Sequence, residues 1–343
     1  MLSTATLRAD FSYQQTSQIT GGTLLHTVQA LGALSAEAGK IGNPEISMIY
    51  VKGDRMATVQ PNSISIIDLN QEAFIHIDLQ HRTWYKLTFA EMKVRFEKLH
   101  AKMTQHTADD KKTDVDVNFD VRIRKTGAQQ DFDGMKADET ILTLLMDATS
   151  TQNAQQSGNM SMTSDLWLVP EIQGYNELRD FQRRYALKLA GIMDPGMEMS
   201  ASLLQRPGSA EAMARLAAEA QKLHGVPVLT ISRMGSTADG SPIPAASEAP
   251  LPADTPTPSA SDLAKQGAVS VLTSRLPFGG FGHKKNADSD KQNADANSAQ
   301  KKPVSVLMET KVTMTNFSTA PVDPSHFDIP AGFREVSSPS ERH

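Results

Sequence analysis

Residues Glu45–Met103 decide the fold, and they read EISMIYVKGDRMATVQPNSISIIDLNQEAFIHIDLQHRTWYKLTFAEMKVRFEKLHAKM. Short β-branched and aromatic runs alternate with turn-like spacers, which predicts an antiparallel meander. Thr88 and Glu91 form a capping box, and apolar residues then recur at helical spacing from Phe89 to Met103. The stretch therefore predicts a twisted antiparallel sheet with a helix packed against it.

Strand and helix patterns continue on both sides of this stretch. Asp114–Arg124 alternates strictly between apolar and charged residues, which predicts a strand with one face in water. Thr126-Gly127 is expected to turn the chain. The other predicted strands are Leu7–Ile19, Asp131–Met146 (one strand or a pair), Met160–Val169, Val226–Ile231 and Val304–Phe317. The other predicted helices are Leu24–Leu34, Tyr175–Leu189, Ser209–Leu223 and Leu263–Leu276.

The chain of 343 residues is long enough for about two domains, but the pattern favours one. Strand-forming sequence lies on both sides of residues 237–302, so this segment is predicted to be a mostly disordered insertion into a single domain formed by residues 1–236 and 303–336. Within it, Thr237–Ala260 is dominated by Pro, Ala, Ser and Thr, which is typical of an extended linker. Phe327, Ile329 and Phe333 are expected to fold the end of the chain back onto the core, and residues 337–343 to form a flexible tail.

Composition excludes several classes of function. The net charge of −5 gives no broad attraction to nucleic acid or to anionic membranes. There is no cysteine, which excludes disulfides, thiolate metal sites and cysteine nucleophiles. No apolar run approaches the ~20 residues of a transmembrane helix. The first residues lack the basic start and apolar core of a signal peptide, so we expect either a cytoplasmic protein or one whose leader is not part of this chain.

No motif indicates catalysis, a metal or a cofactor. The aspartates of 114–120 have the spacing of a calcium loop, but Phe119 stands where an EF-hand requires glycine, so a solvated strand face is the better interpretation. His76, Asp78 and His81 lie close in sequence but are too few for a metal site, and a polar strand face is the simpler account. The sequence therefore favours a protein that is not an enzyme.

Three segments carry a resemblance to known families. They are residues 19–22 with 50–56, residues 67–69 with 75–78 and 82–85, and residues 165–175, which read DLWLVPEIQGY. Together they resemble the bacterial domain-of-unknown-function family numbered 4412, whose members are envelope proteins. Residues 53–85 also resemble, more loosely, the half-barrel of the LolA/LolB lipoprotein carriers. The resemblance implies an α+β fold in which a strongly curved antiparallel sheet holds helices on its concave face, and a periplasmic or otherwise extracytoplasmic location.

Two functions follow as expectations. The first is a non-enzymatic envelope protein that shields a lipid or acyl chain, with flexible methionines such as Met193, Met197 and Met199 adapting the site. The second is a structural or interaction protein, with an envelope protein as its expected partner, whose sheet is filled by its own side chains. The apolar side chains expected to line a ligand site are Phe89, Met92, Phe96, Trp167, Tyr175, Phe181 and Tyr185. For Trp167, which is followed by Pro170, a packed strand-to-helix corner is the structural alternative.

Overall fold

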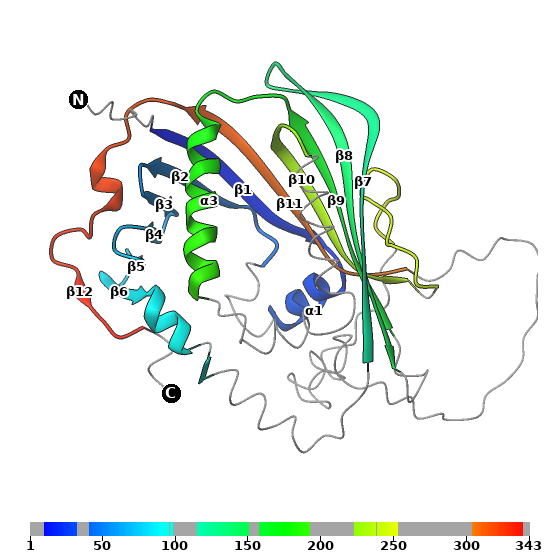
Figure 1. The fold of residues 1–343 in the computed structure, drawn as a ribbon, viewed down its shortest axis with the longest axis horizontal. Helices are drawn as coiled ribbons and strands as arrows, with labels where there is room; N and C mark the ends of the chain where they lie inside the picture. Colours follow the sequence, from blue (N-terminus) through cyan, green and yellow to red (C-terminus); the bar gives the residue numbers. More distant parts are fainter. Residues whose placement is uncertain are drawn as a thin grey trace, which may run out of the picture.

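A computed structural model describes residues 10–32, 41–95, 97–98, 115–150, 158–192, 223–237, 239–252 and 304–338. These residues form a twelve-stranded sheet with the order β12-β6-β5-β4-β3-β2-β1-β11-β10-β9-β8-β7 (Figure 1). The strands are β1 (Phe11–Gly21), β2 (Glu45–Lys52), β3 (Arg55–Val59), β4 (Ser63–Asp68), β5 (Ala73–Asp78), β6 (Thr83–Thr88), β7 (Val115–Phe132), β8 (Met135–Ser150), β9 (Gly158–Val169), β10 (Val226–Thr237), β11 (Val304–Ser318) and β12 (Arg334–Glu335).

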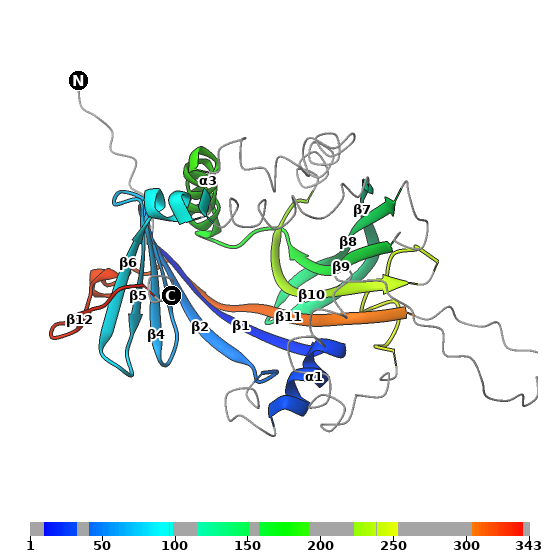
Figure 2. The ribbon, with the colours of Figure 1, turned by 90° about the horizontal axis from the view of Figure 1, so that it is seen from below.

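The sheet is open and mostly antiparallel, and it curves (Figure 2). Within the described residues, β12 and β6 make the one parallel pairing. Helix α3 (Tyr175–Ile192) lies on the inner side of the curve, and α1 (Thr23–Gly32) lies on the outer side against β1 and β11. The expectation of a curved antiparallel sheet is confirmed in its coarse form, but α1 shows that the helices do not all pack on the concave face.

The predicted meander is confirmed as β2–β6, which pair in chain order. Its tight turns place Gly53, Glu72 and Arg82 in the left-handed region, with φ of 60°, 47° and 54°. The predicted capping box then starts a helical segment at 89–95. The Thr88 amide donates to Glu91 Oε2 at 2.7 Å, and the Glu91 amide donates to Thr88 Oγ1 at 3.2 Å.

The predicted turn at Thr126-Gly127 is wrong. Strand β7 continues to Phe132, and Thr126-Gly127 lies in an irregularity of the β7–β8 register between Lys125 and Gln129. The chain turns at Asp133-Gly134 instead, where both residues have positive φ (52° and 82°) as a two-residue hairpin requires. The segment Asp131–Met146 is therefore a pair of strands, one of the two alternatives that the pattern left open.

The predicted linker over 237–260 is wrong for residues 239–252, which we call the strap. Ile243 and Ala245 of the strap are 1% and 0% exposed, and the strap lies beside the half of the sheet formed by β7–β10, where it is yellow in Figure 1. A proline-rich segment can pack in this way because its backbone groups bond to side chains of the sheet, as described below. Residues 253–303 lie outside the described part of the chain, as do the predicted helices Ser209–Leu223 and Leu263–Leu276.

The outer side of the β2–β6 half is covered by the end of the chain. Val322 and Phe327 are buried there with Ala57, Ile66 and Ile77. Ile329 and Phe333 pack against the same cluster, so the expectation that the chain end folds back onto the core is confirmed. In the described residues, no helix has both the length and the apolar character needed to cross a membrane.

Candidate functional site

Six of the seven side chains predicted to line an apolar site meet in one cluster. Phe89 and Phe181 are 1% and 0% exposed and belong to the buried part of the cluster, whose strand residues come from β1–β5 and from β8–β11. The partly buried members that pack against it include Met92, Trp167, Tyr175 and Tyr185. Phe96 lies outside the residues whose side chains the structure describes. Residues from three separate segments of the sequence, which were predicted to lie together, therefore meet in the structure.

The rings of this cluster fill the space beneath α3. Ring centroids lie 5.1 Å apart for Phe74 and Phe89, 6.0 Å for Phe74 and Tyr185, and 6.4 Å for Phe181 and Tyr185. Such spacings are those of packed aromatic pairs. Burial also raises the pKa of Tyr185, so its phenol is neutral at ordinary pH. In this half of the sheet, the predicted residues form a core around α3.

Polar contacts also hold α3 over the meander. Arg184 forms an ion pair with Asp54, and its Nη2 donates to the Gly53 carbonyl at 2.8 Å. One turn further on, Lys188 Nζ donates to Glu72 Oε1 at 2.5 Å. These contacts connect α3 to two hairpin turns of the meander. Polar contacts therefore hold the helix in addition to the apolar packing beneath it.

The inner side of the other half of the sheet carries a second apolar surface. The register aligns Val121, Leu144, Met162, Met234 and Met308 across β7, β8, β9, β10 and β11. We call this surface the methionine face; its members are Phe119, Val121, Ile123, Leu142, Leu144, Met146, Met160, Met162, Leu166, Met234, Met308 and Val312. Each of them is partly exposed, unlike Phe89 and Phe181.

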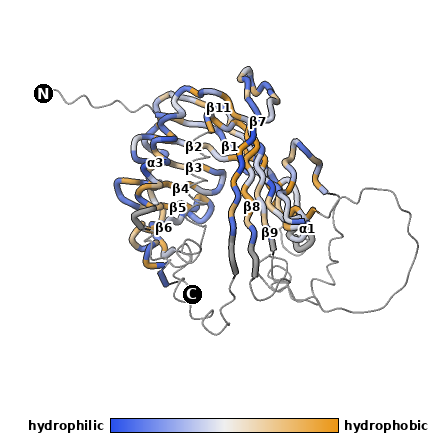
Figure 3. The backbone as a smooth tube through the Cα atoms, turned by 45° about the vertical axis from the view of Figure 1, so that its right-hand side comes forward, coloured by the Kyte–Doolittle hydropathy of each residue, from blue (hydrophilic) through white to orange (hydrophobic). Residues whose placement is uncertain are grey.

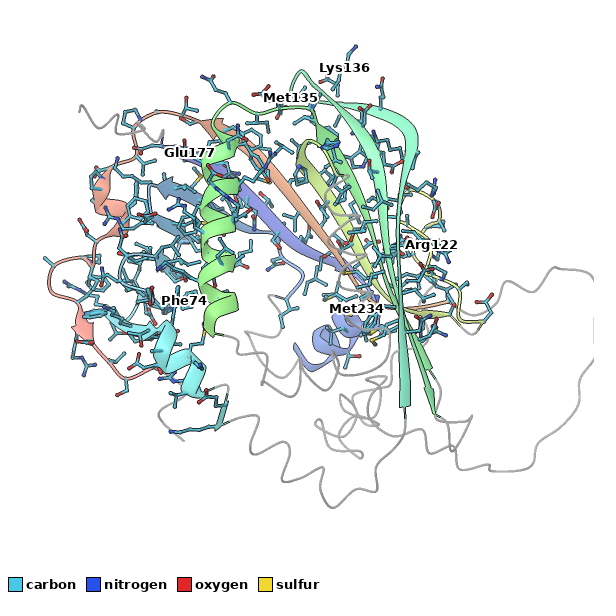
Figure 4. All side chains as sticks on the ribbon, in the orientation of Figure 1. Phe74, Arg122, Met135, Lys136, Glu177 and Met234 are labelled. Carbon is cyan, nitrogen blue, oxygen red and sulfur yellow. The ribbon has the colours of Figure 1, made fainter. Side chains whose placement is uncertain are left out.

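The two faces of this half differ sharply. Figure 3 shows hydrophobic residues recurring along β7, β8 and β9, and Figure 4 places Arg122 and Met234 on opposite sides of the sheet. The side that carries Arg122 also carries Thr163 and Arg233, which the strap covers. Helix α3 contacts β1 and β2, and no other described helix makes a comparable contact with β7–β10. In the described part of the chain, no helix packs over the methionine face on β7–β10 as α3 packs over β1 and β2.

A pair of hydroxyls gives the methionine face a polar spot. Ser164 and Ser232 stand one position beyond Met162 and Met234 on the same side, and their Oγ atoms lie 2.8 Å apart. Towards β1, Val228 and Met314 belong to the buried cluster under α3, so the two apolar surfaces are continuous. Apolar walls with a few polar groups are typical of ligand sites.

A separate groove of about 710 Å³ is lined in part by Met135, which is labelled at the top of Figure 4. Its lining is Asp133, Met135, Glu171, Ile172, Gln173, Thr315, Asn316, Phe317, Ser318 and Thr319. None of the seven predicted residues is among them, and the lining is largely polar. The groove therefore does not correspond to the predicted apolar site.

The histidines of the meander make local contacts. His81 Nδ1 lies 2.7 Å from Asp78 Oδ2, and this contact together with the backbone amide of His81 lowers the pKa of Asp78. His76 packs against Tyr85 on the next strand, with ring centroids 5.3 Å apart. Within the described residues, no group of three or more His, Cys, Asp or Glu side chains could hold a metal ion.

Sequence reasoning missed the methionine face. Met193, Met197 and Met199, the methionines it singled out, lie outside the described residues. Period-two spacing was available as a signal, because Met160, Met162, Ser164 and Leu166 occupy alternate positions of one strand. No protein-family model matches the chain, and a search of curated proteins found no match.

Proposed function

We propose that this protein is a non-enzymatic carrier that holds a lipid or acyl chain against the methionine face. The observation that supports the proposal most strongly is the continuous row of partly exposed apolar side chains across β7–β11, next to a tightly packed core under α3. The resemblance to envelope family 4412 and to the LolA/LolB half-barrel supports an extracytoplasmic location and a half-barrel shape as parts of the same proposal.

The chemistry of the face suits an apolar ligand of variable shape. Methionine has three rotatable side-chain bonds and a polarisable sulfur, so a surface with Met146, Met160, Met162, Met234 and Met308 can adapt to different chains. About ten CH₂ groups removed from water contribute roughly 8 kcal/mol, which is near the free energy of a ~1 µM dissociation constant. Ordering the ligand costs part of this, so we expect micromolar or weaker affinity.

A specific observation favours the rival function, a structural protein with a self-filled sheet. Phe89, Phe181 and their ring neighbours pack against one another beneath α3, as the side chains of a filled core do. The two functions therefore differ in what happens at the methionine face, and variants should be placed there and not under α3.

Binding of a fluorescent fatty acid to delipidated protein tests the proposal. Val121 and Arg122 are neighbours on the outermost described strand, β7, and point to opposite sides. We expect saturable binding by the wild type, at least about tenfold weaker binding by Val121→Glu or Leu144→Glu, and unchanged binding by the matched control Arg122→Glu. Melting curves must show that each variant is folded. Folded wild-type protein that shows no saturable binding contradicts the carrier proposal and supports the structural one.

A further inference from the structure

The strap is held by side chains that point out of the sheet. The Ile243 amide donates to Ser161 Oγ at 2.9 Å, and Thr163 Oγ1 donates to the Ile243 carbonyl at 2.8 Å. Four residues on, the Ser247 amide donates to Asp165 Oδ2 at 2.8 Å. Three alternate residues of β9 thus bond the strap backbone, and Asp165 is the one that can ionise.

A buried ion pair on the neighbouring strands β10 and β11 also holds the strap. Arg233 Nε donates to Glu309 Oε2 at 2.7 Å, and Arg233 Nη1 donates to the carbonyls of Ala245 and Ala249 at 3.1 and 2.7 Å. Glu309 Oε1 accepts from Thr20 Oγ1 at 2.7 Å. The charge of Arg233 is therefore balanced by Glu309, and both ends of the pair are hydrogen-bonded.

Two more carboxyl groups are buried beside this pair. Asp165 is 1% exposed and Glu139 is 3% exposed, and they lie on the same side of neighbouring strands, because Ile141, two residues from Glu139, pairs with Asp165. Glu139 Oε2 accepts from Thr126 Oγ1 at 2.6 Å. The second oxygen of each group, Asp165 Oδ1 and Glu139 Oε1, is buried and has no hydrogen-bond partner in the described structure.

Such an arrangement favours a bound proton. An ionised carboxylate without donors is costly to bury, whereas the protonated acid is neutral and provides its own donor. Burial raises the pKa of Asp165; the Ser247 hydrogen bond opposes this shift, and the charge of Glu139 adds to it. The charge of Arg233, which is paired with Glu309, also opposes the shift. Arg124 and Glu248 of the strap form an exposed ion pair nearby.

We propose that Asp165 and Glu139 form a buried proton-binding site, and that the strap docks firmly when the site holds a proton and loosens when the proton leaves. Asp165 is the residue that transmits the change, because its Oδ2 accepts from the strap while its Oδ1 faces buried surroundings. Strap docking that depends on a protonated Asp165 is complete below the ordinary aspartate pKa and is lost as pH rises through the raised one. This proposal stands independently of ligand binding on the other side of the sheet.

Hydrogen exchange of the full chain at a series of pH values, corrected for the intrinsic exchange rate, tests this. We expect protection of the Ile243 and Ser247 amides to fall at least about tenfold as pH rises, while amides of β4 and β5 stay protected. Asp165→Asn keeps an acceptor for the Ser247 amide but cannot ionise, so its strap should stay protected at every pH. Glu139→Gln removes the neighbouring charge and should move the midpoint to lower pH.

The matched control is Arg124→Gln, which breaks the exposed pair with Glu248 and should leave the midpoint unchanged. A wild-type strap whose protection does not vary with pH would overturn the proposal, and so would an Asp165→Asn strap with the wild-type profile. If Asp165→Asn fails to fold, the midpoint shift of Glu139→Gln decides the question. Protection that follows added calcium at constant pH, and not pH, would show that a metal cation balances the two carboxylates and would also overturn it.

Discussion

At the scale of single residues, Arg233 connects three parts of the chain. It stands on β10, pairs with Glu309 on β11, and donates to strap carbonyls contributed by residues 244, 245 and 249. Arginine suits this role because its planar group carries five donors, so one side chain can serve an anion and several carbonyls at once. With 3% of the side chain exposed, these bonds are shielded from water.

Arg233→Met should be strongly destabilising. It leaves the Glu309 carboxylate buried without its cation, which typically costs ~3–5 kcal/mol, and the free energy of unfolding can be measured by urea titration. The double variant Arg233→Met/Glu309→Met should recover much of the loss, since no uncompensated charge is left. A single variant that loses no more than Arg124→Met, whose exposed pair is worth about 0–1 kcal/mol, would contradict this account of Arg233.

At the scale of elements, the sequence predicted most strands but missed the strap that covers one side of β7–β10. The meander and its capping box follow from local spacing, because Thr88, Glu91 and the apolar runs lie within one turn or one hairpin of each other. The turn between β7 and β8 was misplaced because two X-Gly pairs, at Thr126 and Asp133, offered the same signal. Only the pairing with β8 shows that Gly127 lies within the β7–β8 ladder while Asp133-Gly134 closes the hairpin.

The strap could not be predicted from its own residues. Its Pro- and Ala-rich composition is that of a linker, and its partners Ser161, Thr163 and Asp165 lie some 80 residues earlier in the chain. The methionine face was even harder to predict from the sequence, because its side chains come from five strands. Their alignment depends on the register of each pair, which no single stretch of sequence reveals.

Ile243→Ala should lower the melting temperature of the protein. Ile243 of the strap is 1% exposed, and truncating a buried isoleucine to alanine typically costs ~2–5 kcal/mol. The matched control is Ile46→Ala, because Ile46 is 51% exposed and should tolerate the change. Equal melting temperatures for the two variants would mean that the strap contributes nothing to stability, which is the behaviour expected of a linker.

At the scale of the whole molecule, the curved sheet depends on a strand from near the end of the chain. Strand β11 lies between β1 and β10, and therefore joins the meander half to the half that carries the methionine face. From the sequence, Val304–Phe317 was predicted to be a strand, but its place in the sheet was not. Its central place makes the two halves interdependent, because neither β1 nor β10 has another described partner on that side.

Cutting the chain after Lys302 should therefore give insoluble protein. The truncation removes β11 together with the C-terminal segment that covers the outer side of β2–β6. It also leaves β1 and β10 each with an unpaired edge where β11 lies in the full chain. Cutting after residue 338 is the matched control and should leave solubility unchanged. A soluble truncation at residue 302 that melts cooperatively would show that each half folds without β11.

Photo-crosslinking would show most directly whether an apolar ligand lies on the methionine face, as we propose. Delipidated wild-type protein would be irradiated with a fatty acid that carries a diazirine in its chain, and the labelled peptides identified by mass spectrometry. The account predicts saturable labelling of β8 and β9, at residues such as Leu144 and Met162, that excess unlabelled fatty acid removes. Labelling confined to the strap side of the sheet, or labelling that excess fatty acid does not reduce, would contradict it.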